Sequence, residues 1–257
     1  MEPTVDLNAD MGESFGHWVM GDDAALLDIV TSANIACGLH AGDWDVMAQI
    51  MRMAVAGDVG IGAHPGFPDI QGFGRRRMML PHESLGNLVR YQVGAAQAMA
   101  RAAGGEVRHV KLHGALSNMT SQDEAMARAC YEAALSVAPD VIIMVLAGTK
   151  QQDAVRDLGC RVACEIFADR AYNDDATLVD RSQPGAVIHD AARAGARMAE
   201  MVREGAIITE SGKRIPTRID TICLHSDTAT AVSIATEVRR ALKESGVRLK
   251  RFEGVPV

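Results

Sequence analysis

The sequence has few aromatic residues and no excess of basic charge. Phe, Trp and Tyr together make up 4% of the 257 residues, so aliphatic side chains and methionine must fill most of any core. Lys and Arg number 26 against 33 Asp and Glu, which gives a formal net charge of −7. This balance excludes the broad positive field with which proteins hold nucleic acid or an anionic membrane surface. A small anionic ligand would need local positive groups instead.

Cysteine pairs and long apolar runs are also missing. The five cysteines include no C-x-x-C pair, which favours reduced thiols in a cytoplasmic protein. No apolar run approaches the roughly 18 residues of a membrane span, and "MEPTVDLNADMGE" lacks the basic and apolar regions of a signal peptide. Hydrophobic residues make up 48% and charged residues 23%, a globular balance. We therefore expect a cytoplasmic protein whose residues 1–257 form a single domain.

Familiar nucleotide-binding and nucleophile motifs are matched only in part. "GESFG" (12–16) fits G-x-S-x-G, but it follows the first predicted strand and precedes "HWVMGDD", which does not suit a nucleophile elbow. "GIGAHP" lacks the third glycine of a dinucleotide fingerprint, and "ESGKR" lacks the Ser or Thr of a phosphate loop. The sequence therefore contains no recognisable nucleotide-binding loop.

Strand-like apolar runs alternate with helical patterns along the whole chain. The predicted strands are residues 4–8, 33–37, 59–64, 107–113, 141–146, 161–167 and 220–225, and 247–252 is a further strand or a tail. The predicted helices cover 22–30, the residues after 43, 81–103, a segment opening with a capping box at Ser121 and Glu124, 149–158, 186–203 and the residues after 227. Residues 206–218 are typical of a polar hairpin. This alternation predicts a parallel sheet, as a seven-stranded barrel or an open doubly wound sheet.

Polar side chains at the strand ends distinguish these two architectures. They are Asn8, Asp10 and Glu13; Asn34, His40 and Asp43; His64; Lys111, His113 and Asn118; Glu165, Asp169, Arg170 and Asn173; and His225 and Asp227. In a parallel barrel all strand ends converge on one rim, whereas an open sheet brings together only two neighbouring units. Six of the seven units contribute, so we predict a seven-stranded parallel β/α barrel with a site at its carboxyl rim.

Some of these polar residues have a simpler structural interpretation. Asp43 and Asp227 stand where helix N-caps belong, and capping alone would explain either of them. Four histidines that do not close strands are expected to be structural: His17, His82, His109 and His189. The four that close strands at the same rim are treated as a functional set: His40, His64, His113 and His225. Arg75 and Arg76, in a glycine-rich loop, form either a solvated charge run or a binding group for carboxylate or phosphate.

Seven segments, taken in order, resemble the LamB/YcsF family from residue 5 to about residue 227. They are "DLNADMGESFG", "SANIACGLHAGD", "GAHPGFPD", "GFGRR", "VKLHGALSN", "FADRAYND" and "CLHSD". The resemblance implies a seven-stranded β/α barrel of the glycoside hydrolase/deacetylase type. It also implies ATP-dependent hydrolysis of 5-oxo-L-proline to L-glutamate in a complex with two further subunits, B and C. The chain departs from the family pattern at Leu112, Ser117, Ile166 and Ser226, which concerns substrate fit and loop shape.

The implied reaction suggests roles for the rim residues. A lactam amide is stabilised by resonance, and ATP can activate it by phosphorylating the amide oxygen. Asp10, His40 or His64 would be the general base toward water, and His113 or His225 the general acid toward the leaving nitrogen. Lys111, Arg75 and Arg76 would bind the substrate carboxylate or the phosphate. The predicted substrate-binding set is completed by Asn8, Asn34, Glu165, Asp169 and Arg170.

Two other uses of the same residues stay open. Asp10 and His40 are candidate ligands of a divalent metal, since Asp and His suit zinc or manganese, although no H-x-x-x-H pair is present. The chain would then be a deacetylase-like hydrolase that acts without ATP. The missing phosphate loop favours a different alternative, in which partner subunits bind most of the ATP and this chain only binds 5-oxoproline, without a catalytic role.

Overall fold

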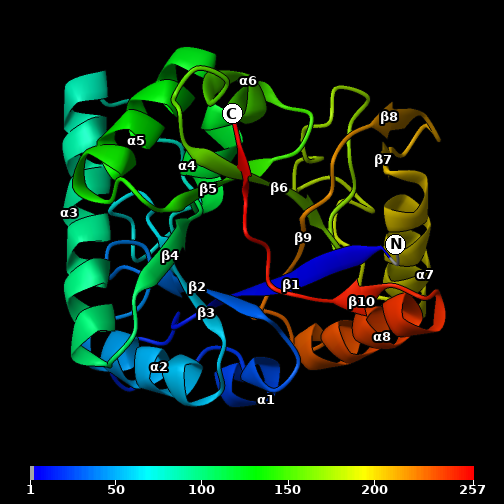
Figure 1. Ribbon diagram of the computed structural model, residues 1–257, viewed down its shortest axis with the longest axis horizontal. Coiled ribbons are helices and arrows are strands. Elements are labelled where there is room, and N and C mark those ends of the chain that lie inside the picture. Colours follow the sequence, from blue (N-terminus) through cyan, green and yellow to red (C-terminus); the bar gives the residue numbers. More distant parts are fainter. Residues whose placement is uncertain (1–2) are drawn as a thin grey trace.

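Seven buried strands pair in parallel and close into a barrel in the computed structural model, which describes residues 3–257 (Figure 1). The strands are β1 (Thr4–Met11), β2 (Ser32–Ala36), β3 (Gly60–His64), β4 (Val107–Val110), β5 (Ile142–Leu146), β6 (Arg161–Phe167) and β9 (Thr221–Leu224). Each pairs with the next, and β9 pairs with both β6 and β1. The predicted barrel is therefore confirmed, because an open sheet would leave two unpaired edges.

Seven helices pack around the outside of this barrel within residues 3–257 (Figure 1). They are α1 (Asp23–Leu27), α2 (Trp44–Ala56), α3 (His82–Ala102), α5 (Glu124–Val137), α6 (Lys150–Ala154), α7 (Ala191–Glu204) and α8 (Ala231–Glu244). Helix α2 buries Met47, Ile50, Met51 and Ala54, the face that the helical spacing predicts. Within residues 3–257, no helix is both long enough and apolar enough to cross a bilayer.

The predicted helix start at Asp43 is right, whereas the starts at residues 121 and 186 are wrong. Asp43 caps α2, since its carboxylate accepts the backbone N–H groups of Asp45 and Val46. The capping box at Ser121 is wrong because a short helix, α4 (Gly114–Thr120), ends there and Asp123 caps α5 instead. Helix α7 begins at residue 191 and not at 186, because the backbone of residues 186–188 bonds back to residues 169–171.

The C-terminal segment closes the amino end of the barrel. After α8 this segment runs across the ends of the strands (Figure 1). The predicted hairpin before α8 is confirmed as β7 (Ala206–Ile208) and β8 (Arg214–Pro216). The short strand β10 (Arg248–Leu249) pairs in parallel with the start of β1, and β11 (Val255–Pro256) pairs antiparallel with the start of β6. Between them Phe252 packs against Ile142, Met144 and Ala163, and its ring lies 5.2 Å from that of His109.

Next to Phe252, the barrel interior holds a connected group of polar side chains, here called the lower network: Asp6, Asn8, Asn34, His109 and Thr221. Thr221 donates to Asp6 at 2.5 Å and accepts from Asn8 at 2.7 Å, Asn34 donates to Asn8 at 2.6 Å, and His109 Nε2 lies 2.7 Å from Asn34 Oδ1. A Cβ at Gly62 would lie 2.0 Å from the His109 ring, so only glycine leaves room for it. The lower network therefore satisfies its own polar groups.

Candidate active site

A cavity of about 400 Å³ opens at the carboxyl rim of the barrel. Seven of the sequence-predicted site residues line it: Asp10, His64, Arg75, Lys111, His113, Arg170 and His225. Five further basic or acidic residues line the same space: Glu13, Arg77, Asp180, Arg181 and Asp227. The strand ends thus bring carboxylates, imidazoles and cations from distant parts of the chain into one hollow.

The remaining predicted residues lie outside the cavity wall. Asn8, Asn34 and Glu165 lie deeper in the barrel, and Asp169 lies behind His225. His40 is fully buried beside the cavity. Arg76 points away: its side chain is 58% exposed and pairs with Asp69. The structure therefore places Arg75, but not Arg76, at the cavity.

Lys111 lies at the centre of a buried ionic group. Its Nζ is 2.8 Å from Asp10 Oδ1, 2.9 Å from Glu165 Oε1 and 2.9 Å from Cys223 Sγ. Burial disfavours the ammonium, but the charge of Asp10 and its other neighbours outweighs burial and holds the pKa of Lys111 well above its usual value. Burial likewise opposes ionisation of Asp10, yet His64 and Lys111 hold its pKa well below the usual range. Lys111 and Asp10 are therefore a charged pair at neutral pH.

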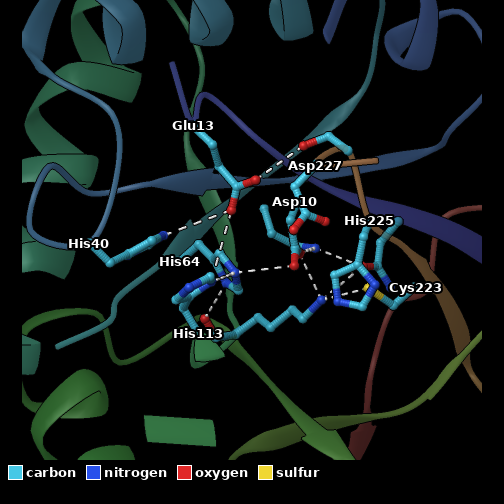
Figure 2. Close-up of polar contacts among 12 residues, drawn as sticks. Asp10, Glu13, His40, His64, His113, Cys223, His225 and Asp227 are labelled. Atoms are coloured by element: carbon cyan, nitrogen blue, oxygen red, sulfur yellow. Dashed lines mark hydrogen bonds and ion pairs between the residues drawn. The ribbon is translucent and has the colours of Figure 1, made fainter. Parts of the chain in front are cut away.

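Glu13, His40, His64 and His113 form a second group, here called the histidine cluster (Figure 2). The His40 and His113 rings stack at 3.7 Å, and His113 Nδ1 lies 3.0 Å from His64 Nε2. Glu13 Oε1 is 4.0 Å from His40 Nε2 and 3.9 Å from His113 Nδ1. Burial, together with the neighbouring imidazoles, lowers the pKa of His40 and His113 well below the usual value. Both rings are neutral at physiological pH.

On the other side of Asp10, His225 is oriented by a buried carboxylate. Its Nδ1 lies 2.8 Å from both oxygens of Asp169, and its Nε2 lies 3.3 Å from Arg181 Nη2. Although burial opposes ionisation, the attraction of His225 lowers the pKa of Asp169. A carboxylate that fixes one ring nitrogen leaves the other directed toward the cavity, which is the arrangement of a positioned proton donor or acceptor.

Asp227 contacts an arginine of the cavity wall and does not cap a helix. Arg75 Nη2 lies 2.6 Å from Asp227 Oδ2, and Thr230, not Asp227, is the N-cap of α8. The N-cap interpretation of Asp227 is therefore wrong, because α8 does not begin until Ala231. Asp227 instead holds Arg75 at the cavity edge.

Three site residues were missed by the sequence prediction. Glu13 was noted at a strand end but given no role, and Arg181 belongs to an irregular segment that has no periodic signal. Cys223 was given no role. Strand alternation could have identified Cys223 as a site residue, because residues 223 and 225 point to the same side of a strand.

Two sets of side chains have the chemistry and spacing of metal ligands. One is the histidine cluster, whose four ligand atoms all lie within 4.8 Å of one another, and the other is Asp10, Cys223 and His225. Nitrogen, carboxylate and thiol donors of this kind are typical of transition-metal sites. The Asp10 and His40 pair named from the sequence is divided between the two sets.

The barrel and its rim site define a fold class, the seven-stranded parallel β/α barrels. A solved deacetylase, described as "T48 deacetylase with substrate", shares this fold with a TM-score of 0.51 at 11% identity, covering 99% of this chain and 94% of that one. Within that class the chain belongs to the LamB/YcsF family, which it matches over residues 5–256.

Relatives of known name are similar over nearly the whole length. The 5-oxoprolinase A subunit of Ruegeria pomeroyi is 70% identical over 249 residues, which cover 97% of this chain and 98% of that protein. The 5-oxoprolinase A subunit of Rhodopseudomonas palustris is 50% identical over 252 residues, covering 98% and 99%. The solved lactam utilization protein of Thermus thermophilus is 41% identical, with a TM-score of 0.90 and coverage of 97% and 100%.

Proposed function

We propose that this chain is the A subunit of a 5-oxoprolinase and that its rim cavity takes part in the ATP-dependent hydrolysis of 5-oxo-L-proline to L-glutamate. The observation that carries the proposal is the 70% identity, over 97% of the chain, to a protein named as the A subunit of 5-oxoprolinase. The cavity suits such a substrate, because about 400 Å³ holds a small molecule and its wall is rich in cations.

The substrate carries one carboxylate and one lactam amide, and the two ends of the cavity offer matching groups. Arg75 and Arg181 line the wall and can bind the carboxylate through charge-assisted hydrogen bonds. Arg170 is held in place by the carbonyl oxygens of Ala186 and Val179, to which it donates. We assign carboxylate or phosphate binding to these arginines and not to Arg76.

Ring opening needs a base for water and an acid for the leaving nitrogen. Asp10 lines the cavity as a carboxylate, so it can accept the proton of an attacking water, with His64 at 3.4 Å as its neighbour. With the amide oxygen phosphorylated, the Lys111 ammonium balances the negative charge of the phosphoryl group, and a second water later releases that group as inorganic phosphate. When the C–N bond breaks, His225, oriented by Asp169, donates a proton to the nitrogen. His40 and His113, both neutral and buried, position this array or bind a ligand within it.

ATP and the partner subunits enter as part of the same proposal. The chain has no recognisable phosphate loop, and the relatives' names identify each of them as one component of a larger enzyme. We propose that subunits B and C supply most of the ATP site. The cavity wall that contains Arg75, Arg170 and Arg181 then binds the phosphorylated substrate. In the alternative, where the chain only binds 5-oxoproline, the same wall is used but no proton transfer takes place.

The test is a reconstitution with separately purified subunits. Glutamate and ADP are measured with 5-oxoproline and ATP, with and without subunits B and C, for the wild type and for His225→Ala. His189→Ala, an exposed histidine outside the cavity, is the matched control. Loss of turnover in His225→Ala alone supports the catalytic role. Full turnover in that variant supports the alternative of a binding role only, and chelator-sensitive hydrolysis without ATP supports the deacetylase alternative.

A further inference from the structure

The histidine cluster holds side chains whose polar atoms converge without being satisfied by one another. One donor atom from each of Glu13, His40, His64 and His113 lies within 4.8 Å of the other three. The four residues follow four successive strands, β1 to β4, so the barrel itself fixes their positions. In Figure 2 dashed lines join His40 and His113 to Glu13, and His64 to His113.

Backbone carbonyls fix which nitrogen of two of the rings can bind a cation. His64 Nδ1 lies 2.8 Å from the Lys111 carbonyl oxygen, and His113 Nε2 lies 2.8 Å from the Phe73 carbonyl oxygen. A carbonyl only accepts, so these nitrogens carry the protons and the opposite nitrogens carry lone pairs when the rings are neutral. Those two lone pairs face each other at 3.0 Å. A ring N–H held by a backbone carbonyl is the usual arrangement of a metal-bound histidine.

His40 provides the second, independent observation. Its ring is fully buried, and neither ring nitrogen has a hydrogen-bond partner within residues 3–257. A Cβ at Gly66 would lie 2.6 Å from His40 Nδ1, and one at Gly74 would lie 2.7 Å from His40 Cβ. The chain therefore makes room for the ring but supplies no partner, at a cost of about 1–3 kcal/mol for each unsatisfied polar group.

A proton shared between His64 and His113 would account for only part of this arrangement. The shared proton would relieve the repulsion between the two lone pairs. It would leave His40 without a hydrogen bond, because Glu13 Oε1 is 4.0 Å from His40 Nε2. The other potential ligand set has no such deficit, because Lys111 Nζ lies 2.8 Å from Asp10 and 2.9 Å from Cys223. An ammonium group already supplies the positive charge there.

We propose that Glu13, His40, His64 and His113 bind one divalent transition-metal ion, with zinc as the preferred metal. Three imidazoles and one carboxylate are an ordinary zinc ligand set, and ligands about 2.0–2.1 Å from the ion lie about 3.3 Å apart in a tetrahedron. The 3.0 Å separation of His64 and His113 is near that spacing, and Glu13 and His40 need only to move inward. With all four tetrahedral positions taken by protein side chains, such an ion would have a structural role and would fix the ends of β1 to β4 beside the cavity.

The experiment measures metal binding and not turnover. The purified full-length chain is stripped with chelator, titrated with Zn²⁺ and with Co²⁺, and examined by elemental analysis, visible absorption and thermal unfolding. We expect one equivalent of metal, the d–d absorption of tetrahedral Co²⁺ and a raised Tm. His40→Ala and Glu13→Gln should weaken binding by at least about tenfold. Cys223→Ser should leave the metal content unchanged.

His40→Ala also separates metal loss from misfolding. It removes an unsatisfied imidazole, so the stripped variant should unfold at or near the wild-type Tm and should lose only the rise on adding metal. Less than a tenth of an equivalent bound to the wild type would overturn the proposal. Retention of the Co²⁺ spectrum in both His40→Ala and Glu13→Gln would do the same, as would its loss in Cys223→Ser, which would move the ion to the other ligand set.

Discussion

Two groups of buried polar side chains occupy the same barrel, the lower network near the amino end and the histidine cluster at the rim. Each contains a fully buried histidine that is neutral because burial lowers its pKa, to about 3 for His109 and well below the usual value for His40. His109 bonds to Asn34 at 2.7 Å, whereas His40 bonds to nothing within residues 3–257. Two equally buried histidines thus differ: within residues 3–257, His109 has a hydrogen-bond partner and His40 has none.

The comparison indicates that buried polar groups are less fully hydrogen-bonded at the rim than in the lower network. Buried polar groups are nearly always hydrogen-bonded in native proteins, and the lower network follows that rule. The rim departs from it at His40 and gathers a carboxylate, Glu13, whose pKa is raised well above its usual value by burial and by the charges of Asp10 and Asp227. Unsatisfied and perturbed groups of this kind cluster at functional sites.

The largest expected effect is on catalysis at the rim. Asp10→Asn keeps the size of the side chain but removes the proposed base and the charge beside Lys111. In the complex with subunits B and C, the rate of glutamate formation should fall at least about 100-fold, the usual contribution of a positioned acid or base. Steady-state kinetics at saturating substrate gives the change in kcat. Wild-type kcat in a folded Asp10→Asn variant would remove Asp10 from the mechanism.

The next prediction compares the two buried histidines directly. His109→Ala leaves Asn34 Oδ1 without its donor and removes the ring that packs against Phe252, so it should lower the free energy of unfolding by about 2–4 kcal/mol. His40→Ala in chelator-treated protein should cost about 2 kcal/mol less, because no hydrogen bond is broken. Urea unfolding of both variants measures the difference. Equal losses would mean that the histidine cluster is as satisfied as the lower network.

Much of the barrel could be predicted from the sequence, because the relevant signals are local. Strand alternation turns Asn8 and Asp10 inward together, and polar residues at the ends of six strands require a common rim. Depth along the barrel is not encoded in that alternation. The sequence therefore could not separate Asn34, which lies in the lower network, from His40, which lies at the rim.

Other features were missed because they depend on pairing across the chain. The strand β10 lies within residues 247–252, where the sequence left open a further strand or a tail, but β11 has only two residues, too few for a periodic pattern. The packing of Phe252 against the barrel end exists only once both strands are paired. Helix α4 has seven residues, less than two full turns, and was hidden in a glycine-containing loop. Arg181 reaches the cavity from an irregular segment, so its position follows from tertiary bonds alone.

A smaller effect concerns the pH dependence of stability in the lower network. Burial raises the pKa of Asp6 from 3.8 to about 6, despite hydrogen bonds from Thr221, Thr31 and Ser32. A carboxyl with a raised folded-state pKa stabilises fully below pH 3.8 and loses that contribution as pH rises through about 6. The whole loss is about 3 kcal/mol, roughly half of it between about pH 5 and pH 8.

Asp6→Asn should remove this part of the pH dependence while keeping the shape of the side chain. The measurement is urea unfolding of the wild type and the variant at both pH values, because every other titrating group contributes equally to the two proteins. The free energy of unfolding of the variant should fall less toward high pH, by about 1.5 kcal/mol. Parallel pH profiles would show that Asp6 is ionised in the folded barrel.

The smallest effect separates two adjacent arginines, one in the cavity wall and one outside it. Arg75 lines the cavity and is 34% exposed, whereas Arg76 is 58% exposed and pairs with Asp69. Arg75→Gln should raise the KM for 5-oxoproline about tenfold with little change in kcat, the loss of one charge-assisted bond that is made equally in the ground and transition states. Arg76→Gln should change KM less than about twofold, as expected for an exposed ion pair outside the site. Equal effects of the two substitutions would place the substrate carboxylate beyond the cavity, on the outer face of the loop, because only there could both guanidinium groups reach it.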